Sequence, residues 1–282
     1  MFPLYFSLFD GVPPVEVVAY RILWSLVFCL ILIALTRSWS RVVEVIRTPR
    51  QLALLVLAAL AISVNWTTYV YSVSTNQVVE AALGYFINPL MTVALGVVVL
   101  RERLASSQWL AVGVAAVGVV IIGVGEGAAP WIGLTLAISF GLYGLLKKMA
   151  GVEAIPSLTV ETAVLAPLAG VVLAFLEVQG SASIVSQGWG LGVLLALLGP
   201  VTAVPLLAYA AAANRLPLAL LGIVQYTTPT VIFLLGITVF GDSVNPVEWV
   251  GFALIWTALA VFSWAALRRP SRVAELEIAE PT

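Results

Sequence analysis

The 282-residue chain contains no histidine and a single cysteine, Cys29. Without histidine the sequence excludes histidine proton relays, serine–histidine catalysis and histidine–glutamate metal sites. A lone cysteine forms no internal disulfide, and the apolar run around Cys29 favours a buried small side chain over a reactive thiol. The sequence also lacks a G-x-x-x-x-G-K-[ST] phosphate loop, which argues against transport driven by ATP. We therefore expect no cofactor, no metal and no catalytic residues.

Charge is scarce as well: 10% of the residues are charged, 62% are hydrophobic, and the mean hydropathy is +1.10. Soluble domains carry about a quarter charged residues. The net charge of −1 gives no basis for binding nucleic acid. The apolar runs lack the alternation of outer-membrane barrel strands, and glycine and proline within them are typical of membrane helices. The sequence therefore predicts an all-α integral membrane protein, with the lipid bilayer as its surroundings.

Apolar runs of the about 20 residues needed to cross a bilayer recur along the chain. We predict nine complete spans, near residues 15–36, 51–73, 79–100, 107–125, 129–148, 157–177, 189–213, 217–240 and 246–267. Residues 1–9 are apolar too, but at about 1.5 Å per residue a helix of this segment is too short to cross a hydrocarbon core of about 30 Å.

The second half of the chain repeats the first at one spacing. Pro89 and Pro229 lie 140 positions apart (229 minus 89), as do Glu102 and Asp242. The same offset relates Gly11 to Gly151, Tyr69 to Tyr209 and Trp109 to Trp249. With the short first segment counted, each half has five spans, and an odd number inverts the second half in the membrane.

This repeat predicts a ten-helix bundle of two inverted five-helix repeats, residues 1–125 and 129–268, followed by a polar tail at 269–282. Shifting the span 129–148 back by the repeat spacing places its counterpart partly before Met1. We therefore expect the chain to start inside its first membrane helix. A nine-span protein with an external N-terminus is the alternative.

The distribution of basic residues predicts the orientation. Of 13 basic residues, 12 lie in every second connection: Arg37, Arg41, Arg47, Arg50, Arg101, Arg103, Lys147, Lys148, Arg215, Arg268, Arg269 and Arg272. Lys and Arg mark cytoplasmic loops. We expect a multi-pass protein of a bacterial-type cytoplasmic membrane with its C-terminus, including the tail, in the cytoplasm.

Polar residues inside three spans are the candidate binding residues. They are Asn65, Tyr69, Tyr85, Asn88, Gln225 and Tyr226. Asn65 and Tyr69 share a helix face, because they are four residues apart. Pro89 and Pro229 each remove a backbone hydrogen bond and are predicted to break their helices. Polar groups beside a broken helix are typical of a midplane solute site. The alternative is hydrogen bonding between helices without a ligand, worth about 0.6 kcal/mol each.

Arg21 and Glu161 are also 140 positions apart (161 minus 21). A charge at membrane depth costs about 2.5–3.5 kcal/mol or more if unpaired. The two are predicted to serve gating or coupling: Arg21 contacts an anionic group or the outer gate, and Glu161 is the deep carboxylate if a proton is the coupling ion. Alternatively, both side chains extend to opposite membrane surfaces.

Several stretches resemble the RarD family of EamA-type permeases, within the drug/metabolite transporter superfamily. They are residues 81–90 (AALGYFINPL) with 101–103, Asn65, Trp66 and Tyr69, residues 139–148 (SFGLYGLLKK), and residues 202–230 from TAVPLLAY to QYTTPT. The resemblance implies ten helices in two inverted EamA repeats around a cavity that opens alternately to each side. It also implies export or exchange of small molecules.

We therefore expect a secondary transporter of small metabolites or drugs that works by alternating access, with a small-molecule solute as partner. The competing hypotheses are a membrane scaffold or sensor that transports nothing, and an intramembrane lipid-modifying enzyme. The enzyme is disfavoured because clustered histidine or carboxylates are missing from the spans.

Overall fold

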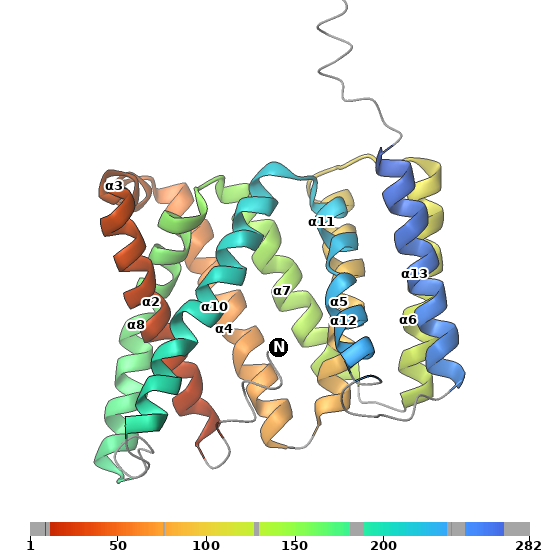
Figure 1. Cartoon of the computed structure of the whole chain (residues 1–282). Helices are drawn as coiled ribbons and strands as arrows, with labels where there is room; N and C mark the ends of the chain where they lie inside the picture. The colour runs from red at the N-terminus through yellow and green to blue at the C-terminus, as the bar shows by residue number, and fades with distance from the viewer. Residues whose placement is uncertain are drawn as a thin grey trace, which may run out of the picture.

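The computed structural model describes residues 9, 12–75, 77–126, 130–180, 189–235, 238 and 246–267. These residues form a bundle of α-helices (Figure 1). The first half contains α2 (Pro14–Thr36), α3 (Trp39–Arg47), α4 (Pro49–Ser74), α5 (Val78–Val98) and α6 (Ser106–Glu126). The second half contains α7 (Pro130–Ala150), α8 (Ala154–Val178), α10 (Trp189–Arg215), α11 (Leu218–Val224), α12 (Thr227–Leu235) and α13 (Pro246–Leu267).

Helix boundaries agree with the predicted spans to within a few residues for most of the bundle. Within the described residues, seven helices are long and apolar enough to cross a membrane: α2, α4, α5, α6, α7, α8 and α10. Proline starts α2 and α4, where its missing N–H has no helical partner to lose. The expected incomplete first span and the tail at 269–282 lie outside the described residues, apart from Phe9.

Two elements differ from the prediction. The basic connection that includes Arg41 and Arg47 contains a helix, α3, whose apolar residues follow a helical period rather than a long run. The span predicted at 217–240 is divided into α11 and α12 by a turn at Gln225 and Tyr226.

The repeat spacing is visible in the helix boundaries. α8, α10, α11 and α13 each begin 140 residues after α2, α4, α5 and α6 respectively (154 minus 14, 189 minus 49, 218 minus 78, 246 minus 106). Three of these equivalent pairs also pack against each other: α2 on α8, α5 on α11, and α6 on α13. α7 packs between α4 and α5, so the second half inserts into the first.

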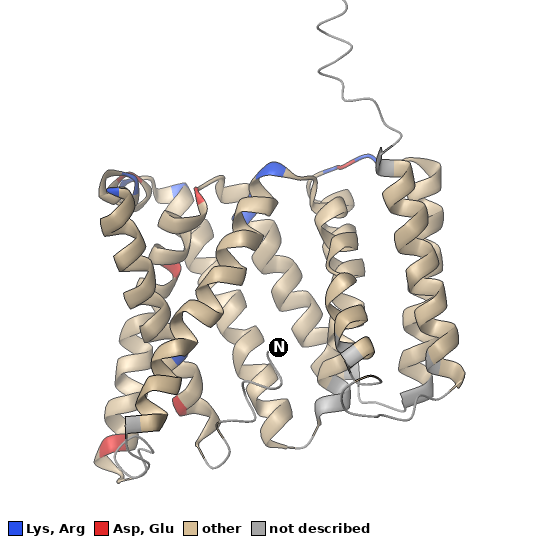
Figure 2. Cartoon of the chain, in the orientation of Figure 1, with Lys and Arg blue, Asp and Glu red and all other residues tan. Residues whose placement is uncertain are grey.

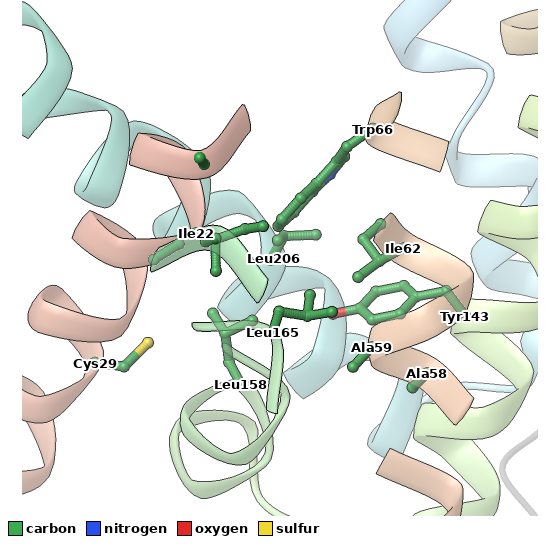
Figure 3. Packing of buried hydrophobic residues seen from close by; sticks show 13 residues of the cluster. Ile22, Cys29, Ala58, Ala59, Ile62, Trp66, Tyr143, Leu158, Leu165 and Leu206 are labelled. Carbon is green, nitrogen blue, oxygen red and sulfur yellow. The ribbon is translucent and has the colours of Figure 1, made fainter. Parts of the chain in front are cut away.

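The core consists of two main apolar clusters. One joins α2, α4, α7, α8 and α10, and includes Cys29, which is fully buried as expected (Figure 3). The other joins α5, α6, α11 and α13. Large side chains on the outer helix faces, such as Val124 and Val178, are exposed, as expected of surfaces that contact lipid.

Basic residues gather at one end of the bundle, the end where α3 lies (Figure 2). They include Arg37 at the end of α2, Lys147 and Lys148 in the last turn of α7, and Arg215 in the last turn of α10. We refer to this end as the basic end. Arg268, Arg269 and Arg272 lie outside the described residues.

Candidate functional site

A cavity of about 290 Å³ lies between the two apolar clusters, in the middle of the bundle. Its walls come from α2, α4, α5, α7, α10, α12 and the turn before α12. Polar side chains in these walls are Arg21, Asn65, Trp66, Tyr69, Tyr85, Asn88, Thr202, Tyr209, Gln225 and Thr228. Apolar residues, among them Phe140 and Leu206, complete the lining. A mainly apolar cavity with a few converging polar groups is the usual form of a small-molecule site.

Lining residues occur in pairs related by the repeat. Tyr69 is matched by Tyr209, and Tyr85 by Gln225, at the spacing of 140 residues (209 minus 69, 225 minus 85). Asn88 is matched by Thr228 at the same spacing (228 minus 88). The cavity therefore lies where equivalent faces of the two halves meet.

Arg21 is the charged residue among those lining the cavity. Its Nε donates a hydrogen bond to Thr202 Oγ1 at 2.8 Å, and its guanidinium lies over the Trp66 ring at 4.2 Å from the centroid. The side chain is buried, with 8% exposed. A planar guanidinium stacked on an aromatic ring is held in one orientation, which a lysine would not reproduce. Three helices, α2, α4 and α10, thus fix one positive charge at the cavity wall.

Asn65 and Tyr69 lie one turn apart on α4 and both line the cavity. Asn65 Nδ2 donates to the Leu136 carbonyl at 2.9 Å and to Ser139 Oγ at 3.1 Å, so this amide connects α4 to α7. The Tyr69 ring meets the Tyr85 ring edge to face, with centroids 6.4 Å apart. Asn65 therefore has a helix-bridging role as well as a place in the wall.

Asn88 and Gln225 connect the two halves directly. Asn88 Nδ2 donates to Gln225 Oε1 at 2.5 Å, and Gln225 Nε2 lies 3.4 Å from Thr92 Oγ1. Asn88 Oδ1 is buried and has no hydrogen-bond partner among the described residues. A buried acceptor without a partner costs free energy, which a donor on a bound solute would recover.

The two prolines expected to break their helices behave differently. α5 continues through Pro89, so the break expected there is absent. Pro229 follows the turn at Gln225 and Tyr226; the Gln225 carbonyl accepts from Thr228 N at 3.0 Å because Pro229 has no N–H to donate. The break therefore exposes Gln225 at the cavity.

Tyr226 and Glu161 lie away from the cavity. Tyr226 is 1% exposed and packs in the cluster of α5, α6, α11 and α13. Glu161 Oε1 lies 2.5 Å from Lys147 Nζ and accepts a hydrogen bond from Ser157 Oγ at 2.8 Å. Arg21 and Glu161 thus have different partners in different parts of the bundle.

Sequence reasoning missed two features of this region. It assigned Lys147 to a surface connection, although its side chain is 2% exposed and neutralises Glu161. It also omitted Tyr209 from the candidate residues, although the repeat relates Tyr209 to Tyr69 and so indicates the same cavity.

Comparison with known proteins identifies the class. The sequence model of the EamA-like transporter family matches residues 1–124 and 128–264. Over 282 residues the chain is 46% identical to Protein RarD of Streptomyces exfoliatus, covering 99% of this chain and 89% of that protein. It is 41% identical to an uncharacterized transporter of Vibrio cholerae, covering 94% and 88% of the two chains. A crystal structure of a protein 19% identical in sequence superposes with a TM-score of 0.72 over 95% of this chain and 94% of that one, which shows a common fold.

The bundle and its matches define a multi-pass membrane transporter rather than an enzyme. The chain belongs to the EamA-like transporter family, with RarD proteins among its relatives. The predicted resemblance is thereby confirmed.

Proposed function

We propose that this chain moves small metabolites or drugs across the membrane by alternating access around the central cavity. The observation that carries the proposal is the Asn88–Gln225 hydrogen bond, which crosses between the two repeats at the cavity wall. A solute that binds there contacts both repeats at once. Rocking one repeat against the other then changes the side to which the cavity opens.

In this proposal the bundle has ten helices in two inverted five-helix repeats, residues 1–125 and 129–268. The matching helix starts and the packing of equivalent helices support this arrangement. The basic end faces the cytoplasm of a bacterial cell, because Lys and Arg concentrate on the cytoplasmic side of membrane proteins. The C-terminal tail is then cytoplasmic.

Asn65, Tyr69, Tyr85, Asn88 and Gln225 serve as solute-binding residues in the proposal, because all five line the cavity. Tyr226, the second residue of the turn that carries Gln225, supports the site indirectly by anchoring this turn in the cluster of α5, α6, α11 and α13. Arg21 contacts the solute or gates the outer side, and Pro229 maintains the helix break. Glu161 is the coupling carboxylate if a proton is carried.

The test is a thermal shift of the purified full chain in detergent against amino acids, aromatic metabolites, chloramphenicol and nucleotide precursors. A ligand at about 100 times its dissociation constant stabilises the folded state by about 2.7 kcal/mol. The shift is expected to disappear in Asn88→Ala and Gln225→Ala. Gln51→Ala is the matched control, because Gln51 donates to the Ala150 carbonyl at the basic end, away from the cavity.

The same ligand is then assayed for flux into proteoliposomes. Flux that is lost in Gln225→Ala and kept in Gln51→Ala supports transport through the cavity. Binding without flux would instead favour a sensor, and a well-folded protein that binds nothing in the panel would contradict a small polar solute.

A further inference from the structure

A small apolar cluster joins α7, α10 and α11 near the basic end of the bundle. Its buried members are Leu145, Ala213, Leu218 and Leu221, and we refer to them as the basic-end plug. They come from α7, α10 and α11, and Tyr209, which lines the cavity, packs against them. The plug therefore lies next to the cavity wall, on the side of the basic end.

One carboxylate from the first half fixes the start of α11, the helix that supplies two plug residues. Glu102, in the connection after α5, accepts hydrogen bonds from Leu218 N at 2.7 Å and from Ala219 N at 2.8 Å, one on each oxygen. The first N–H groups of a helix have no partner within the helix, and hydrogen bonds to a carboxylate are stronger than those between neutral groups. Glu102 therefore anchors α11 from the other repeat.

The backbone around Glu102 is shaped for this contact. Glu102 N donates to the Gly96 carbonyl at 3.1 Å. A Cβ at Gly96 would lie 2.9 Å from Glu102 Oε2 and 3.1 Å from Ala219 N, closer than such atoms ordinarily approach. Gly96 therefore provides the space in which the carboxylate meets α11.

Lys148 connects the ends of α7 and α10 to the contact between Glu102 and α11. Its Nζ lies 4.0 Å from Glu102 Oε1 and donates to the Ala213 carbonyl at 3.2 Å and also to the Leu216 carbonyl. The ends of α7 and α10 are thereby connected to Glu102 and, through it, to α11. Polar contacts of Glu102 and Lys148 thus join the three helices that supply the plug.

The opposite end of α11 contacts α5 and leads to the cavity. Gly222 packs against the Pro89 carbonyl of α5, and a Cβ there would lie 2.7 Å from that oxygen, so backbone meets backbone. The helix ends at the turn that carries Gln225. Movement of α11 at its Glu102 end is therefore transmitted over seven residues to the Asn88–Gln225 pair.

We infer that Glu102 is the latch of a gate at the basic end: while its carboxylate binds Leu218 N and Ala219 N, the plug stays closed, and its release opens the cavity toward the basic end. The inference rests on the proposed alternating-access function. Neither the cavity residues nor the family match assigns this role to Glu102, which the repeat had singled out only as the partner of Asp242. Asp242 lies outside the described residues.

The experiment measures access to the plug rather than transport. The single cysteine is removed by Cys29→Ala, and Leu221→Cys places a reporter in the plug, where the leucine is 5% exposed. An impermeant maleimide is applied to one side of sealed vesicles at a time. Ser40→Cys, at an exposed position of α3, identifies the side that the basic end faces.

Adding Glu102→Gln is expected to raise the labelling rate of the reporter on the order of tenfold from the basic-end side only, as lost helix caps permit. Gly96→Ala, which displaces the same carboxylate, is expected to act in the same direction. Glu153→Gln is the matched control, because Glu153 is an exposed carboxylate at the same end that pairs with Arg41, and it should leave the rate unchanged.

Equal labelling in Glu102→Gln and its parent would overturn the latch, and so would a rise from both sides, which means general loosening. If Glu102→Gln does not fold, the labelling of Gly96→Ala is compared with its parent instead, and the same two results would overturn the latch. Labelling requires no solute, so failure of the latch is separate from failure of the transport proposal. One-sided opening with no flux of any solute would refute transport and leave the latch standing.

Discussion

The buried ion pair of Lys147 and Glu161 gives the sharpest prediction for stability. The two side chains are 2% and 1% exposed, and Nζ lies 2.5 Å from Oε1. Ser157 Oγ accepts from Lys147 at 2.6 Å and donates to Glu161. Glu161→Gln removes the negative charge and leaves an ammonium group buried between α7 and α8.

Breaking a buried pair by removing one partner costs about 3–5 kcal/mol, whereas replacing both partners is often neutral. Because glutamine still offers an oxygen to Ser157, we expect the lower end, about 3 kcal/mol, for Glu161→Gln. At about 2–4 °C per kcal/mol, the melting temperature falls on the order of 10 °C. The double variant with Lys147→Met should recover most of this loss. Both are measured by thermal unfolding of the purified protein in one detergent.

The control is the ion pair of Arg41 and Glu153, whose side chains are 53% and 62% exposed. Exposed pairs contribute about 0–1 kcal/mol, so Glu153→Gln should leave the melting temperature nearly unchanged. A double variant no more stable than Glu161→Gln would refute the argument from an uncompensated charge. The double variant also tests coupling, because pH-dependent transport that survives without both charges removes Glu161 as the coupling residue.

Two further predictions concern the contacts that shape the bundle and the cavity. Gly251→Ala would place a Cβ 2.4 Å from Ile122 Cγ1, so we expect α13 to separate from α6 and the melting temperature to fall, because overpacking costs about 1–3 kcal/mol of stability. Gly113→Ala, at an exposed position of α6 with open space around it, should be neutral or slightly stabilising in the same assay. Arg21→Lys keeps the charge but loses the planar group held by Trp66 and Thr202. Ligand titrations followed by thermal shift should therefore show about tenfold weaker binding. An unchanged affinity would exclude Arg21 from solute contact.

Much of the bundle follows from two simple properties of the sequence. Apolar runs predict where helices cross the membrane, and the repeat predicts where they begin, as the equivalent starts of α4 and α10 illustrate. The candidate cavity residues could also be predicted from the sequence, because a polar side chain in an apolar span has to face protein or a cavity. Five of the six predicted binding residues line one cavity, and the repeat itself indicated a further lining residue, Tyr209.

The remaining features depend on contacts between distant segments, which hydropathy does not encode. Lys147 looks like a residue of a basic connection until α8 places Glu161 beside it. Glu102 lies between Arg101 and Arg103, a charged sequence typical of an exposed loop. Its carboxylate nevertheless binds the backbone N–H groups at the start of α11, more than a hundred residues later in the chain. Hydropathy did not predict α3, because this helix is short and amphipathic rather than uniformly apolar.

The two halves also differ where their sequences agree most closely, and the difference shapes the cavity. Pro89 in α5 and Pro229 in α12 occupy equivalent positions of the repeat, so proline alone does not decide which helix breaks. α5 stays continuous through Pro89, whose carbonyl packs against Gly222 of α11. The break occurs instead at Gln225, on the helix held at its other end by Glu102, and it presents Gln225 to Asn88. A repeated sequence thus produces an unequal pair, the continuous α5 and the divided α11 and α12, and that inequality builds the amide pair at the cavity.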